Sequence, residues 1–99
     1  MSTPIIYVVS DSVGETAELV TKAAISQFNG SGMTLKRFPY VEDKEHIEEV
    51  LSLVSHDKGM IAYTLVKPDM RTYLKERADE DGIQAVDLIG PIIDQIQIF

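Results

Sequence analysis

Short runs of apolar and β-branched residues alternate along the chain with longer stretches in which apolar residues recur at helical spacing. Residues 5–9 and 60–66 are almost entirely apolar, which is typical of parallel strands covered on both faces. Residues 33–40 mix apolar and polar positions and indicate a strand near the edge of a sheet. Residues 83–88 complete a predicted set of four strands.

The stretches between these runs predict helices. Helical spacing favours helices over residues 15–28, 44–56 and 68–81, and a fourth helix is expected to begin at Gly90. Asp43 stands where its side chain can cap the second helix. The expected buried faces are, helix by helix, Ala17, Val20, Ala23, Ala24 and Phe28; Ile47, Val50, Leu51 and Val54; and Met70, Tyr73 and Leu74.

The regular alternation of strand and helix predicts an α/β fold. It calls for a three-layer open sandwich with a mainly parallel four-stranded sheet, the first strand central and helices on both faces. Residues 29–32, Asn-Gly-Ser-Gly, are expected to stop the first helix. We predict a single domain over residues 1–99, and the pattern leaves the strand order open.

The last predicted helix is rich in isoleucine. Ile92, Ile93 and Ile96 are expected to cover the fourth strand. Ile98 and Phe99 would then lie exposed at an end without a cap, as in one domain cut from a longer protein. Such an end favours either fraying or self-association, so a homodimer is one expectation.

Composition and charge narrow the function. Hydrophobic residues make up 44% and charged residues 25%, as in ordinary globular domains. A formal net charge of −7 argues against nucleic acid as a partner. The absence of cysteine excludes disulfides and thiolate sites, and with two histidines we expect no metal site. The sequence shows neither a membrane-spanning run nor a signal peptide, so we expect a cytoplasmic domain.

The segment after the first strand carries the most informative polar residues. Ligands of open parallel sheets bind beyond the carboxyl ends of the strands. There, the hydroxyls of Ser10, Ser12 and Thr16 and the backbone near Gly14 could hold a phosphate or carboxylate. Alternatively, Asp11 or Ser12 merely caps the first helix, and local sequence favours this second interpretation.

Charged residues follow the third and fourth strands. Lys67 and Arg71 could bring positive charge to the same edge and help to bind an anion. The alternative, slightly favoured, is a solvated pair beside Asp69 and Glu42. Asp87 lies near the end of an apolar strand, where a carboxylate needs a partner, and this favours a role in a site or a polar network.

Two motifs resemble one family. Residues 5–18 contain the string Ser-Asp-Ser-Val-Gly-Glu-Thr-Ala at 10–17, and residues 86–91 read Val-Asp-Leu-Ile-Gly-Pro. Together they resemble the opening part of the pyruvate, phosphate dikinase regulatory protein family, which is related to the phosphoenolpyruvate synthase regulatory proteins. Residues 37–41 also resemble it, and the likeness covers essentially the whole chain, although family members are considerably longer.

The resemblance implies a bifunctional serine/threonine kinase and phosphorylase. Such an enzyme uses ADP to phosphorylate a threonine of pyruvate, phosphate dikinase or phosphoenolpyruvate synthase. It uses inorganic phosphate to remove that phosphoryl group and releases pyrophosphate. The family's nucleotide site is associated with a later Gly-x5-Lys-Thr motif, which these 99 residues lack. We therefore expect an N-terminal domain that is inactive alone.

Under this interpretation the polar loop would hold a phosphate. Ser10, Ser12, Gly14 and Thr16 would bind the anion, and Asp11 is a candidate base for the threonine proton. The alternative is a flavodoxin-like flavin- or phosphate-binding module, although Tyr40 is the one aromatic residue expected near a flavin ring.

Overall fold

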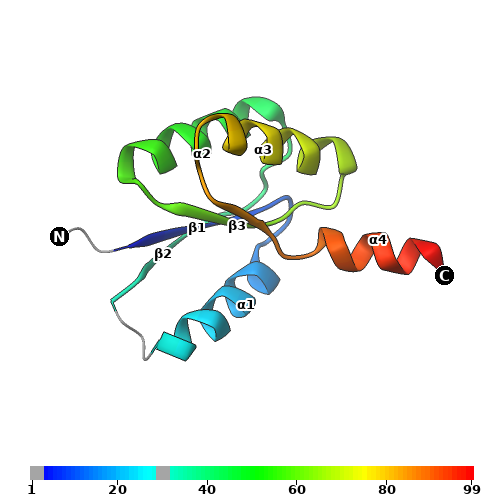
Figure 1. Cartoon of the computed structure of the whole chain (residues 1–99), viewed down its shortest axis with the longest axis horizontal. Coiled ribbons are helices and arrows are strands. Elements are labelled where there is room, and N and C mark those ends of the chain that lie inside the picture. The colour runs from blue at the N-terminus through cyan, green and yellow to red at the C-terminus, as the bar shows by residue number, and fades with distance from the viewer. Residues whose placement is uncertain (1–3, 29–31) are drawn as a thin grey trace.

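Parallel strands form one sheet in the order β2-β1-β3-β4, within a computed structural model that describes residues 4–28 and 32–99 (Figure 1). The strands are β1 (Ile5–Ser10), β2 (Thr34–Phe38), β3 (Met60–Thr64) and β4 (Ala85–Asp87). Helices alternate with them along the chain. The predicted α/β fold with a four-stranded parallel sheet is confirmed, and the strand order is now defined.

The central position of β1 follows from its composition. The strand pairs with β2 on one side and with β3 on the other, and its Tyr7, Val8 and Val9 are fully buried. Tyr7 and Val9 belong to the main core, which two of the helices also form. In β2, by contrast, each residue is exposed or partly exposed, as expected for an edge strand. β4 is shorter than the predicted strand over 83–88, since its pairing with β3 extends over three residues only.

Helices α2 (Lys44–Asp57) and α3 (Pro68–Glu80) cover one face of the sheet (Figure 1). The Asp43 carboxylate accepts a hydrogen bond from the His46 N–H at 2.8 Å, which confirms the predicted cap of α2. The predicted apolar stripe of α2 is likewise buried in the main core. Its members are Ile47, Val50, Leu51 and Val54.

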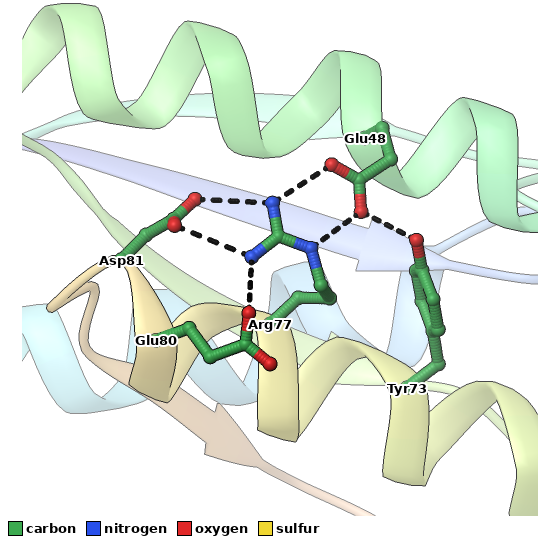
Figure 2. Close-up of polar contacts among 5 residues, drawn as sticks. All are labelled: Glu48, Tyr73, Arg77, Glu80 and Asp81. Atoms are coloured by element: carbon green, nitrogen blue, oxygen red, sulfur yellow. Dashed lines mark hydrogen bonds and ion pairs between the residues drawn. The ribbon is translucent and has the colours of Figure 1, made fainter.

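An ion-pair network joins α2 to α3 (Figure 2). Arg77 Nε and Nη2 donate to the two carboxylate oxygens of Glu48 at 2.8 and 2.9 Å, and Tyr73 Oη donates to the same carboxylate at 2.5 Å. Arg77 also forms ion pairs with Glu80 and Asp81 at the C-terminal end of its own helix. Hydrogen bonds from Arg77 and then Tyr73 lower the pKa of Glu48. The Glu48 carboxylate therefore connects α2 to α3.

The opposite face carries α1 (Glu15–Ile25), which ends in a short 3₁₀ turn, η1 (Ser26–Phe28) (Figure 1). The prediction for its buried face is partly wrong. Ala17 and Thr21 are buried, but Val20 is 46% exposed and Phe28 62% exposed. In the described part of the chain no second helix lies beside α1 to enclose these side chains. The predicted stop at 29–32 falls mainly outside the described residues.

Helix α4 (Gly90–Ile98) extends away from the sheet (Figure 1). The prediction that it covers the fourth strand is wrong, because Ile92 and Ile96 are 60% and 63% exposed. Its Asp94 carboxylate instead pairs with Arg71 Nη2 of α3 at 3.5 Å. Ile98 and Phe99 are exposed, as predicted. Among the helices in the described ranges, none has the length and hydropathy needed to cross a bilayer.

Candidate functional site

A pocket lies beyond the carboxyl ends of β1 and β3. Its walls are residues 10–16, Thr64, Val66 and Ile89. The strand order reverses here, because β1 leads through α1 to β2, whereas the chain then returns through α2 to β3 on the other side of β1. Such switch points are where open α/β sheets bind ligands. The pocket thus includes every candidate in the loop after β1.

Gly14 controls how α1 begins. Its φ of 91° lies in the left-handed region that favours glycine, and a Cβ there would also touch the Arg37 side chain at 3.4 Å. Within the described residues no side chain caps α1, so the prediction that Asp11 or Ser12 caps it is wrong. The first-turn N–H groups therefore have no side-chain acceptor, and the positive end of the helix dipole lies at the pocket.

Asp11 is occupied by a long-range contact. Its Oδ2 accepts a hydrogen bond from the backbone N–H of Val66 at 2.8 Å. This bond connects the loop after β1 to the loop after β3, 55 residues later in the chain. Because the carboxylate bridges the two loops, it does not turn back to cap α1. Asp11 remains partly exposed at the pocket wall.

Ser10 and Ser12 organise the base of the loop. Ser10 is buried, and its Oγ accepts the Ser12 N–H at 3.0 Å and lies 3.4 Å from Ser12 Oγ. The carbonyls of the two serines accept the N–H groups of Val41 and Tyr40 at 2.8 and 2.9 Å. The segment after β2 therefore fixes the loop through two backbone hydrogen bonds. The Ser12 side chain is exposed.

The remaining two candidates are placed differently. Thr16, the second residue of α1, is exposed and lines the pocket. Lys67, the residue before α3, is exposed but does not line it, although the adjacent Val66 does. Sequence reasoning missed Thr64 as a pocket residue. The register that pairs Ser10 with Thr64 is the signal that identifies it, and that register could be read only once the strand order was known.

Asp87 holds the turn that brings Ile89 to the pocket. Its Oδ1 accepts the N–H groups of Ile89 and Gly90 at 3.1 and 2.6 Å. Its Oδ2 lies 4.0 Å from Nη1 of Arg71. The prediction that this carboxylate needs partners is therefore confirmed.

Arg71 is not the solvated cation that was predicted. Its side chain is 13% exposed and lies between Asp87 and Asp94 instead of beside Asp69 and Glu42. A Cβ at Gly90 would overlap both the Asp87 carboxylate and Arg71 Nη1, so a larger residue there would require these side chains to move. Burial, followed by the nearby Asp87 charge, raises the pKa of Tyr63 beside this cluster to about 12.

The chemistry available in the pocket is that of hydrogen-bond donation. Hydroxyls of Ser12, Thr16 and Thr64 accompany the uncapped N–H groups at the start of α1. The charged side chains in the wall are the carboxylates of Asp11 and Glu15. An anion would therefore be held by backbone and hydroxyl donors, as at other helix N-termini that bind phosphate. Among the described residues, no group of three or more His, Asp or Glu side chains could bind a metal ion.

Comparison with known proteins agrees with the motifs. A family described as kinase/pyrophosphorylase matches residues 6–99. A protein from Halalkalibacterium halodurans is 57% identical over 93 residues, covering 94% of this chain and 34% of its own length. Relatives from Shouchella clausii and Bacillus velezensis are 53% and 56% identical, covering 93% and 98% of this chain and 34% and 37% of theirs.

These three relatives carry the name pyruvate, phosphate dikinase regulatory protein. This chain spans about a third of their length. Neither the matched family nor these names support the flavodoxin-like alternative.

Proposed function

The chain belongs to the kinase/pyrophosphorylase family, and on that basis we propose that it is part of a bifunctional enzyme that regulates pyruvate, phosphate dikinase. In the forward reaction, a threonine hydroxyl of the dikinase attacks the terminal phosphorus of ADP. The bond to the nucleotide oxygen breaks, AMP leaves and the hydroxyl gives up its proton. Phosphoenolpyruvate synthase is the alternative protein substrate.

In the reverse reaction, inorganic phosphate attacks the phosphothreonine. A new phosphorus–oxygen bond forms pyrophosphate, the bond to the threonine oxygen breaks, and that oxygen takes a proton. Both directions need a site that holds a phosphate or phosphoryl group. The site must also exclude the water that would otherwise hydrolyse phosphothreonine.

The pocket at the end of β1 is the proposed phosphate site. The observation that carries this assignment is the uncapped start of α1, which leaves helical N–H donors at the pocket. Ser12 and Thr16 contribute hydroxyl donors. Buried Ser10 fixes the loop conformation, because its Oγ accepts the Ser12 N–H. Asp11, partly exposed at the same wall, is the proposed base for the threonine proton.

ADP needs more than this pocket provides. The Lys-Thr loop associated with the family's nucleotide site is absent from these 99 residues. Lys67, exposed next to the pocket wall, is proposed to contact the phosphate from the rim. The rest of ADP would then bind to the part of the family's chain outside this sequence.

Phosphate titration followed by amide NMR tests the site. Inorganic phosphate is expected to shift the amide signals of residues 14–16 in a saturable way. Gly14→Ala is expected to weaken binding at least tenfold, because the side chain strains the left-handed backbone that directs these amides. Gly82→Ala is the matched control, since Gly82 also has a positive φ, of 69°, but lies outside the pocket.

The outcomes separate a phosphate site from a simple helix start. Binding that survives Gly14→Ala, or shifts confined to other regions, would remove the proposed phosphate site. Equal weakening by Gly82→Ala would attribute the effect to general loss of stability and would equally contradict the assignment.

A further inference from the structure

One face of the sheet is incompletely covered. In the described ranges α2 and α3 pack on one face, whereas α1 alone lies on the other (Figure 1). Beside α1 runs an apolar groove, lined among others by Ile6, Val20, Ile25, Met60, Val86 and Leu88. Parallel sheets in proteins are normally buried on both faces. An open groove of this kind therefore indicates a missing layer.

The surface that the groove presents is apolar. Thr21 of α1 lines the groove but is only 4% exposed, and its Oγ1 is enclosed by the surrounding residues. An occupant of the groove would therefore meet apolar side chains.

The chain's own last helix does not fill the groove. The Asp94–Arg71 pair connects α4 to α3, which belongs to the opposite layer. Helix α4 also exposes Ile92 and Ile96, which lie one turn apart. Ile92 and Ile96 therefore form a second exposed apolar surface, and neither of them lines the groove.

The length of the family's proteins suggests the occupant. The relatives extend over about three times the length matched here, so 66% of the first relative lies outside the match. We propose that a helix from this remaining part of the family's chain packs in the groove beside α1. A helix fits because its backbone is hydrogen-bonded internally, and the apolar walls of the groove offer no partners for an extended segment. This inference rests on family membership and not on the phosphate site.

Thiol labelling can test it directly, because the chain has no cysteine. Val20→Cys and Val86→Cys place a thiol in the groove at positions that are both 46% exposed. Leu53→Cys is the matched control, at 45% exposure on α2. Each variant is made in the 99-residue chain and in a full-length family protein carrying these 99 residues. Peptide mass spectrometry then reports the labelling rate at each introduced thiol.

We expect the two groove thiols to react at least tenfold more slowly in the full-length protein, with little change at position 53. Equal rates in the two proteins would overturn the proposal. So would slow labelling already present in the 99-residue chain. If the 99-residue chain itself labels slowly, protection that rises with its concentration would identify a second copy as the occupant, and protection independent of its concentration would show that α4 folds back. Equal slowing at position 53 would show general shielding and also contradict a specific contact in the groove.

Discussion

Gly90, outside the pocket, leaves space that neighbouring charged side chains occupy. It opens α4 directly beside the Asp87 carboxylate, and this carboxylate accepts its N–H at 2.6 Å. Arg71 Nη1 lies in the same space, where a Gly90 side chain would begin. Because Gly90 has no side chain, the Asp87 carboxylate and the Arg71 guanidinium can both lie close to the start of α4. Through the same turn Asp87 positions Ile89 in the pocket wall.

Gly90→Ala is expected to lower the free energy of unfolding by about 1–3 kcal/mol, because the new methyl group overlaps the Asp87 and Arg71 side chains. Urea denaturation provides the measurement. Gly82→Ala serves as the comparison, since its methyl group would meet no atom within 4 Å and only the positive φ opposes it. A loss at position 90 no larger than at position 82 would show that the cluster adjusts and that the space is not required.

At the scale of single elements, sequence predicted α2 best. Asp43 caps it and its apolar stripe is buried, because both the cap and the covering partners are present in the chain. Periodicity also defined an apolar face for α1 and for α4. On these faces, however, Phe28 and Ile92 are exposed. Spacing shows which residues share a face, whereas burial depends on a partner that spacing cannot supply.

The contact between α2 and α3 should depend on pH. Hydrogen bonds from Arg77 and Tyr73 lower the pKa of Glu48, so the folded state favours its charged form. This stabilisation is present above the carboxyl's unfolded pKa and is lost as pH falls through the folded pKa. Glu48→Gln is expected to cost about 0.5 kcal/mol at pH 7, because solvent screens the partly exposed pair.

Urea denaturation at a series of pH values checks this expectation. The difference between wild type and Glu48→Gln should shrink as the solution is acidified below the folded pKa of Glu48. Glu49→Gln is the control on the same helix, where the described residues show no ion pair. A difference that stays constant down to the acid limit would show that the Glu48 charge does not contribute.

At the scale of the whole molecule, sequence located the candidate site but misjudged its details. The rule that ligands bind at the carboxyl ends of parallel strands identified the loop after β1. The prediction of a side-chain cap failed because local sequence could not reveal that Val66, 55 residues away, engages Asp11. Thr64 entered the pocket only through the register between β1 and β3, which depends on strand order.

The proposed separation of the phosphate pocket from the nucleotide site leads to the last prediction, that these 99 residues alone transfer no phosphoryl group. Phosphoryl transfer requires the attacking and leaving oxygens to be held in line, with positive charge on the transferred group. The pocket supplies neutral donors beside Asp11 and Glu15, and the sequence lacks the Lys-Thr loop. A full-length family protein that carries these residues is expected to form phosphothreonine when it is mixed with ADP and pyruvate, phosphate dikinase. The 99-residue chain is expected to form none.

The Asp11→Asn variant of the full-length protein should lose at least a hundredfold in rate if Asp11 is the base. Turnover by the 99-residue chain would contradict the proposed separation, and full activity of Asp11→Asn would remove Asp11 from the reaction while leaving the phosphate site to the NMR titration.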